Sequence, residues 1–357
     1  MPKSFKFSMS APFSFNLPPE LAAKEPPERR GIGRDQVHLL VIDRENGKRT
    51  HTRFDHIGEF LQAGDLLVFN SSRTLPAALK GCAAKAAPCI EARLAEHLPD
   101  DSWLVLLLCQ NGDPFGCGLR DGMDIHFGDD LTATVIRRDE RIPRLWQMRF
   151  SKSGTELVDE IYRLGQPIRY EYVSAPWDLD YYQTVYAQQP GSAEMPSAGR
   201  AFTWKLLFDL KRRGIEIAYI VLHTGLSSYM DDDLDARHPT SEEEYFISEA
   251  TAEKINRAHV QKRRVIAVGT TVVRALESAA AENARVTAGH NYTRLRITEN
   301  HRLKMVNSLL TGMHEPEASH LDLLTAFLPP EQIRAAYEEA VELKYLWHEF
   351  GDLNLII

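Results

Sequence analysis

At positions 265–278 the chain reads Val-Ile-Ala-Val-Gly-Thr-Thr-Val-Val-Arg-Ala-Leu-Glu-Ser. The apolar, β-branched run at 265–268 is typical of a strand buried in a parallel sheet. Gly269 permits a tight turn, and Thr270 and Thr271 are residue types that cap a following helix. Free backbone N–H groups at the start of that helix suit a polar or anionic ligand. The stretch predicts a strand–turn–helix unit, although many α/β proteins share this pattern without binding a ligand there.

The alternation of strands and helices continues on both sides of this stretch. Strands are predicted at 37–43 and 65–69, a helix at 203–213, a strand at 216–222, a helix at 248–261, a strand at 305–311 and a helix at 330–343. Such alternation indicates a parallel sheet covered by helices. Residues 1–36 are rich in proline and charge, and they predict an irregular arm.

A different pattern occupies residues 76–151. Short β-type runs at 103–109, 131–136 and 145–150 are separated by Gly and Asp turns, which is typical of a small antiparallel barrel. The predicted fold is therefore a Rossmann-like α/β domain with an inserted β-barrel. The α/β domain takes residues 1–75 and 152–357, and the barrel takes residues 76–151.

Composition and charge narrow the function classes. The chain has 357 residues and a formal net charge of −8, so RNA binding would require a local basic patch. The candidates are 211–213, 262–264 and the basic residues of 294–304, each of which is explained more simply as a solvated helix end or strand face. No run approaches the roughly 18 apolar residues of a membrane span. The four cysteines form no Cys-x-x-Cys pair, which predicts neither a zinc site nor a disulfide framework and indicates a cytoplasmic protein.

Three further segments are dense in polar groups at the ends of predicted elements, the first of them before the helix at 203–213. The first is the loop 190–200, which contains Ser197 and Gly199. The second begins at His223, directly after the strand at 216–222, and the third, 310–321, contains His314 and Glu315. Ligands of open α/β sheets bind beyond the carboxyl ends of the strands. Three such loops on one rim would form a pocket for a polar, adenosine-sized ligand, in which histidine can act as acid or base.

Metal binding is the alternative for the third segment, because His314, Glu315 and His320 could gather around an ion. Their spacing matches no standard zinc motif, so the sequence predicts no metal.

Taken together, several segments resemble the S-adenosylmethionine:tRNA ribosyltransferase-isomerase family of the queuosine pathway. They run in order through nearly the whole chain: Gly64–Asn70 with Arg73 and Pro76, Tyr182–Ala187 with Pro190-Gly191, Pro196–Gly199 with Phe202-Thr203, Leu222–Gly225, Val265–Ser278, Leu309–Thr311 with His314 and Pro316, and Tyr345 with Gly351-Asp352. The resemblance implies an α/β domain with an inserted barrel, as the pattern of elements also does.

The resemblance also implies the chemistry. S-adenosylmethionine is the ribosyl donor, 7-aminomethyl-7-deazaguanine in tRNA is the acceptor, and epoxyqueuosine forms as adenine and methionine leave. A base must take a proton from the carbon beside the sulfonium, and an acid must help adenine to leave. We assign these roles to His223, His314 and Glu315. The expected ligand contacts come from Ser197, Gly199, Gly269, Thr270, Thr271, Arg274 and Glu277. S-adenosylmethionine is a co-substrate, no other cofactor or metal is expected, and the expected state is a monomer.

The chain departs from the family pattern in four loops. These are Arg200-Ala201, where the family has Leu-His, and the segments 226–229, 312–316 and 169–172. Changes confined to loops indicate a divergent paralogue that keeps the donor site and alters the acceptor. Two alternatives follow: S-adenosylmethionine chemistry with a non-tRNA acceptor or with none, and a non-catalytic RNA-binding protein on the same scaffold.

Overall fold

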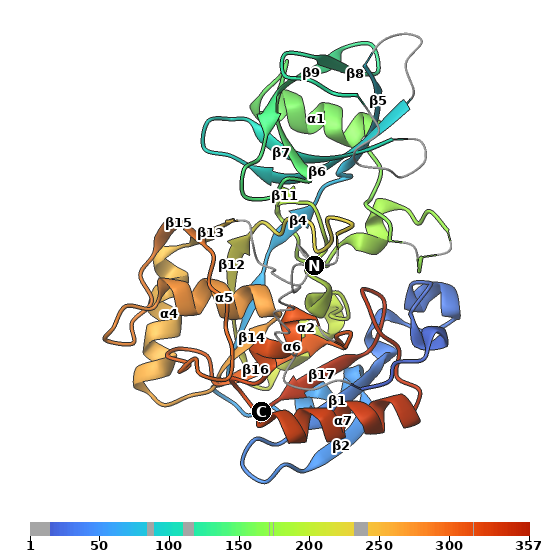
Figure 1. Ribbon diagram of the computed structural model, residues 1–357. Coiled ribbons are helices and arrows are strands. Elements are labelled where there is room, and N and C mark those ends of the chain that lie inside the picture. The colour runs from blue at the N-terminus through green and yellow to red at the C-terminus, as the bar shows by residue number, and fades with distance from the viewer. Residues whose placement is uncertain are drawn as a thin grey trace, which may run out of the picture.

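The computed structural model describes residues 15–83, 89–109, 118–170, 172–173, 175–231, 242–316 and 318–357. A mixed sheet forms the centre of the larger of its two units (Figure 1). The first 14 residues of the predicted arm lie outside these ranges. The strands of the sheet lie in the order β15 (Gly289–Thr293), β13 (Glu243–Ile247), β12 (Glu216–Leu222), β3 (Leu66–Asn70), β14 (Val265–Val268), β16 (Ser308–Gly312), β17 (Leu353–Ile356), β1 (His38–Ile42) and β2 (Arg49–Arg53).

Four central strands, β12, β3, β14 and β16, are parallel, as the sequence predicts. The C-terminal strand β17 instead pairs antiparallel with β16, with Gly312 opposite Leu353, and it pairs parallel with β1. The predicted parallel sheet is therefore confirmed for its central strands, whereas β17, β13, β15 and β2 add antiparallel pairs. An apolar run of four residues does not encode strand direction, which depends on the edge at which the connecting segment enters the sheet.

Helices cover both faces of the sheet, since successive strand residues point to opposite sides. Leu66 and Val68 pack in the core beneath α4 (Glu249–Val260), α5 (Thr270–Ala279), α6 (Ser319–Leu324) and α7 (Pro330–Glu342). Leu67 and Phe69 pack in the opposite core with α2 (Trp204–Arg212) and the short 3-10 helices η4 (Phe54–Glu59) and η6 (Ser197–Gly199). Further 3-10 turns are η1 (Pro19–Leu21), η2 (Pro27–Arg30), η3 (Arg34–Gln36) and η5 (Leu179–Tyr182).

The second unit is a closed antiparallel barrel with an apolar core of its own, drawn at the top of Figure 1. Its order is β10 (Leu145–Phe150), β7 (Trp103–Cys109), β6 (Cys89–His97), β5 (Ala78–Cys82), β8 (Asp124–Phe127) and β9 (Leu131–Arg138). A parallel pair, β4 (Ser72–Thr74) with β11 (Gln189–Ser192), lies between barrel and sheet. The predicted fold class is confirmed, whereas the exact domain boundaries at 75/76 and 151/152 stay a prediction.

The differences from the predicted elements have physical causes. The unpredicted helix α1 (Gly154–Leu164) buries only Leu157 and Ile161, which is too few apolar positions for a clear helical period. The strand predicted at 305–311 begins at Ser308. Cys109 is disulfide-bonded, which corrects the prediction that the cysteines form no disulfide. Among the helices of the described ranges, none is long and apolar enough to span a membrane.

Replacing Phe69 by alanine should destabilise the protein strongly. The ring is fully buried on β3 and meets the rings of Tyr186 and Phe202, both at centroid distances of 4.8 Å. We expect the free energy of unfolding to fall by about 3–5 kcal/mol in urea denaturation. Phe208→Ala is the matched control, because Phe208 is 54% exposed on α2, and it should change stability little. Equal losses in the two variants would contradict the assigned core.

Candidate active site

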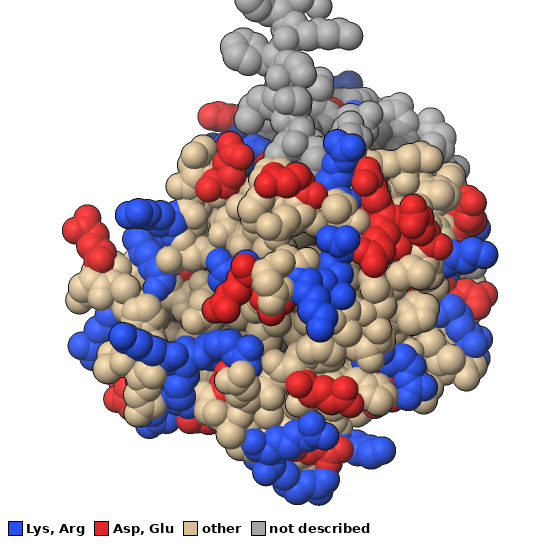
Figure 2. All heavy atoms as spheres, turned by 90° about the horizontal axis from the view of Figure 1, so that it is seen from below, with Lys and Arg blue, Asp and Glu red and all other residues tan. Residues whose placement is uncertain are grey.

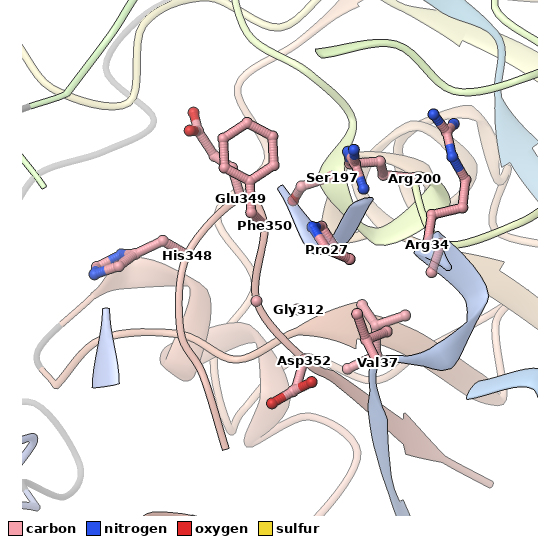
Figure 3. A pocket seen from close by; sticks show the side chains of 13 residues that line it. Pro27, Arg34, Val37, Ser197, Arg200, Gly312, His348, Glu349, Phe350 and Asp352 are labelled. Atoms are coloured by element: carbon pink, nitrogen blue, oxygen red, sulfur yellow. The ribbon is translucent and has the colours of Figure 1, made fainter. Parts of the chain in front are cut away.

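Several strand ends meet along one edge of the sheet. The carboxyl ends of β3, β12, β14 and β16 lie there, and the reversed β17 and β1 bring their amino ends to the same edge. A pocket opens at this edge between chain segments that are far apart in sequence, as Figure 3 shows. Its lining comes from Pro27, Arg34 and Val37, from Ser197, Arg200 and Ala201, from Gly312, and from His348–Leu353. Ligand sites of open α/β sheets occupy this position.

His223 lies at the carboxyl end of β12 and is held by two serines. Its Nδ1 lies 2.8 Å from Ser72 Oγ on β4, and Ser72 Oγ lies 2.6 Å from Ser192 Oγ on β11. The Thr224 N–H donates to Ser192 Oγ at 3.1 Å. If Ser192 donates to Ser72 and Ser72 donates to His223 Nδ1, these bonds use both hydroxyl protons. That arrangement leaves the ring proton of His223 on Nε2.

Gly191 lies so close to the His223 ring that only glycine fits at this position before Ser192. A Cβ at Gly191 would lie 2.5 Å from the His223 ring, so any side chain there would displace the imidazole. Burial lowers the pKa of His223 below its ordinary value of 6.5. At neutral pH the ring is therefore uncharged and can exchange a proton with a ligand.

His314 follows β16 and stacks on His320 of α6, with ring centroids 4.9 Å apart and an interplanar angle of 8°. Its Nε2 lies 2.8 Å from Thr311 Oγ1, and its carbonyl oxygen accepts a hydrogen bond from Trp347 Nε1 at 2.8 Å. Burial, with the neighbouring His320, lowers the pKa of His314 well below 6.5. Burial and then the Arg274 charge lower the pKa of His320 to about 4. Both rings are therefore neutral at pH 7.

The start of α5 lies at the same edge. Gly269 has φ of 101°, a conformation that L side chains rarely adopt, and its N–H donates to the Leu310 carbonyl at 2.8 Å. Thr270 and Thr271 form the first turn of the helix, where backbone N–H groups lack partners within the helix. A Cβ at Gly269 would lie 3.7 Å from the Cβ of Ala198, which places this turn against η6.

Ser197 lines the pocket, whereas Gly199 has a packing role. A Cβ on Gly199 would lie 1.9 Å from the hydroxyl oxygen of Tyr186. The glycine is therefore required by a buried tyrosine, which is a different reason from the predicted approach of a ligand to the backbone.

Two predicted ligand contacts have internal partners instead. Arg274 forms a buried ion pair with Glu243 on β13, and each residue is 5% exposed. The Glu277 carboxylate accepts the backbone N–H groups of Lys304, Met305 and Val306 at 2.8–3.0 Å. These amides precede β16, at the opposite edge of the sheet from the pocket. Glu277 thus binds the backbone of residues 304–306, just before β16. Because these amides bond to a side chain, the strand begins later than predicted.

Glu315, the third residue assigned a catalytic role, has an exposed side chain, and its Oε1 lies 3.3 Å from His348 Nδ1. Partial desolvation of the inner part of this side chain raises its pKa above the ordinary value of 4.5. Its partner His348 belongs to the pocket lining, so the C-terminal segment brings Glu315 to the side of the site.

The residues that sequence reasoning missed are Arg34, Arg200, His348, Glu349 and Asp352. Figure 3 shows the two arginines on one side of the pocket and His348 and Glu349 on the other. Arg200 is 3% exposed and pairs with Glu28 at 2.8 Å. The sequence marks Asp352 only as part of a segment that resembles the family and Arg200 only as a departure from it, and the remaining signal is the aromatic and charged composition of residues 345–352. The segments around the pocket are joined by contacts between residues that are far apart in sequence. One example is the hydrogen bond from Arg30 to the Phe350 carbonyl, across 320 positions, which no local pattern encodes.

Metal ligands do not gather in this region: in the part of the chain that the structure describes, no three His, Cys, Asp or Glu side chains are arranged to hold a metal ion. Basic and acidic side chains are mixed on the face shown in Figure 2. The basic cluster at 262–264 is engaged internally, because Arg263 pairs with Glu216 and Arg264 with Asp65.

Glu277→Ala should lower the free energy of unfolding by about 3 kcal/mol, because it leaves three backbone N–H groups without their acceptor. Urea denaturation measures this loss. Glu253→Ala, which removes an exposed carboxylate from α4, is the control and should change stability by less than about 0.5 kcal/mol. A Glu277→Ala protein as stable as the control variant would contradict the structural role assigned to this carboxylate.

Comparison with known proteins confirms the resemblance. The family model described as queuosine biosynthesis protein matches residues 10–356. The S-adenosylmethionine:tRNA ribosyltransferase-isomerase of Heliobacterium modesticaldum is 36% identical over 349 residues, covering 97% of this chain and 98% of the relative. The enzyme of the same name from Lachnoclostridium phytofermentans is 37% identical over 362 residues, covering 96% of each chain.

The crystal structure of the S-adenosylmethionine tRNA ribosyltransferase of Thermotoga maritima has 29% sequence identity and a TM-score of 0.54. The match covers 97% of this chain and 100% of that one. Fold and sequence therefore agree over nearly the full length of these relatives. The chain belongs to the queuosine biosynthesis protein family, whose named members are S-adenosylmethionine:tRNA ribosyltransferase-isomerases.

Proposed function

We propose that this chain is a transferase-isomerase that transfers the ribosyl part of S-adenosylmethionine to tRNA in queuosine biosynthesis. The names of relatives that match over nearly their whole length carry this proposal. The single structural observation that supports it is that His223, His314 and the pocket lie at the same edge of the sheet, although neither histidine is part of the pocket lining. S-adenosylmethionine is the co-substrate, no further cofactor is required, and the enzyme acts as a cytoplasmic monomer.

The donor is proposed to lie at the edge formed by Ser197, Gly312 and the first turn of α5. Gly312 leaves space beside the backbone, and the amides of Thr270 and Thr271 supply donors for polar groups of the adenosine. Arg34 and Arg200 supply positive charge at the same pocket, although Glu28 pairs with both.

The two histidines suit different roles in the reaction. We assign His314 as the base that takes a proton from the carbon beside the sulfonium, because its burial keeps the imidazole neutral. We assign His223 as the hydrogen-bond donor that stabilises the leaving adenine, because the serine pair directs its Nδ1 and leaves the proton of the neutral ring on Nε2. Gly191 and Ser72 keep this ring in place.

The deciding experiment incubates the purified protein with S-adenosylmethionine, with and without tRNA that carries the deazaguanine precursor. Chromatography then measures adenine and methionine. Release of both only with that tRNA is the expected outcome. Release of adenine without tRNA would indicate another acceptor or plain cleavage. Salt-sensitive tRNA binding without any turnover would indicate a binding protein and contradict the proposal.

Replacing His314 by alanine should reduce turnover by about 100-fold or more, because a positioned general base contributes at least that factor. Single-turnover kinetics with saturating S-adenosylmethionine measure the chemical step directly. His126→Ala removes an exposed barrel histidine and is the matched control, which should leave the rate unchanged. A His314→Ala enzyme with the wild-type rate would remove this residue from the mechanism.

The pH profile of kcat/KM should reflect the lowered histidine pKa values. A neutral imidazole is the active form of the base, so activity is lost as the pH falls through the folded-state pKa. Because burial lowers the pKa of both His223 and His314 from 6.5, the acidic limb should lie below pH 6.5. Circular dichroism over the same range controls for unfolding. An acidic limb centred above pH 6.5 would exclude His314 as the titrating base.

A further inference from the structure

A cluster of carboxyl groups and stacked rings lies beside the pocket and is not used in the mechanism above. It contains Glu194, which follows β11, and Glu349, which lines the pocket, together with Tyr170, Tyr172 and His348. One carboxyl oxygen of Glu349, Oε2, is buried without a hydrogen-bond partner among the described residues. A buried polar atom without a partner costs stability, and this cost points to a group that the site receives from outside.

Three aromatic rings form a column in this cluster. The rings of Tyr172 and His348 stack with centroids 3.9 Å apart and an angle of 11°, and Tyr170 stacks on Tyr172 at 6.0 Å and 18°. The Tyr170 hydroxyl donates to Glu194, which also accepts the Ser227 N–H at 2.7 Å. One carboxylate is thus oriented by the column, while Oε2 of Glu349 has no donor among the described residues.

The cluster contains two carboxyl groups, and the described residues supply no free cation to pair with them. Burial raises the pKa of Glu194, and burial together with the nearby Glu194 raises the pKa of Glu349 to about 8. Arg93, the cation that acts on Glu194, is itself bonded to Glu91 at 2.7 Å. Burial lowers the pKa of His348 to about 4, so this ring supplies no positive charge at neutral pH. Two adjacent carboxyl groups therefore lack a close positive partner in the described part of the chain.

We propose that the Glu194–Glu349 cluster binds the organic cation of a substrate, either the sulfonium of the donor or the aminomethyl ammonium of the acceptor base, between its two carboxylates and against the Tyr170–Tyr172–His348 column. Carboxylates form strong charge-assisted contacts with cations, and aromatic faces attract them. The proposal rests on the function proposed above, since that reaction brings both kinds of cation to this enzyme: the sulfonium of the donor and the primary amine of the acceptor base.

Binding of a cation has a proton consequence. Glu349 holds a proton at pH 7 before binding and releases it when the cation arrives, so that the pair gains one negative charge for each positive charge bound. The titratable groups that face Glu349 are Glu194, Tyr170, Tyr172 and Tyr182, and the pKa of each tyrosine is raised by burial. The tyrosines therefore stay neutral, and the released proton comes from a carboxyl group.

Two pairs of probes test the proposal by isothermal titration. S-adenosylmethionine is compared with S-adenosylhomocysteine, which lacks only the sulfonium charge and its methyl group. The free base 7-aminomethyl-7-deazaguanine is compared with 7-methyl-7-deazaguanine, which lacks the amine. The variants Glu349→Gln and Glu194→Gln keep shape and remove charge. Glu338→Gln, which removes an exposed carboxylate on α7, is the matched control.

In one of the two pairs, wild type and Glu338→Gln should bind the probe that carries the sulfonium or aminomethyl cation more tightly than the probe that lacks it. Glu349→Gln and Glu194→Gln should lose about 10- to 100-fold in affinity for the probe with that cation and keep their affinity for the probe without it. The pair that responds identifies the source of the cation. Titration in buffers of different ionisation enthalpy should show proton release by wild type and not by Glu349→Gln.

Three outcomes overturn the proposal: no preference of the wild type for either cation, variants that bind all probes as the wild type does, or equal losses for charged and neutral probes. The binding assays need no turnover, so they separate this proposal from the proposed function. Wild-type turnover without a cation preference refutes the subsite alone, and a cation preference without turnover refutes the reaction alone.

Discussion

The candidate site depends on the C-terminal strand β17, which lies between β16 and β1 and places the segment 348–353 beside the other residues of the pocket. Its antiparallel pairing places Asp352 at the carboxyl edge of the sheet, where its side chain accepts the N–H of His38 at 2.6 Å and that of Leu346 at 2.7 Å. Its carbonyl also accepts the Met313 N–H at 3.2 Å. One aspartate thus joins the start of β1, the end of β16 and the C-terminal segment. Without this strand, His348 and Glu349 would not face the loops that contain His314 and Ser197.

The edge near α5 and the carboxyl–aromatic cluster are formed by different kinds of groups. The edge near α5 depends on backbone geometry and small residues, since Gly269 permits the turn and Gly312 leaves room beside the chain. In the carboxyl–aromatic cluster, Tyr170 and Tyr172 come from a segment that departs from the family pattern, as do the contacting residues Ser227 and Glu315, whereas Glu194, His348 and Glu349 do not. Loops tolerate such changes because the strands that position them are buried separately.

Much of the fold was predictable because local patterns encode it. The strand at 265–268 and the helix α5 appear where the apolar run and Gly269 predict them, and α2, α4 and α7 end within about a residue of the predicted bounds. The candidate site was predictable only in part. The sequence places His223 and His314 after strands, and the structure brings both to one edge. The internal partners of Arg274 and Glu277 come from segments 27–31 residues away, and no periodicity indicates them.

Burial governs the electrostatics of the site as a whole. It lowers the pKa values of His223, His314 and His348 and raises those of Glu194 and Glu349, so every one of these shifts favours the neutral form. A site of neutral groups avoids the cost of isolated buried charges before substrate arrives. A sulfonium or ammonium brings the charge that makes ionisation of the carboxyl pair favourable. The histidines lie outside that pair and remain neutral, so binding a cation and removing a proton are assigned to separate groups, and the base is not consumed by the binding step.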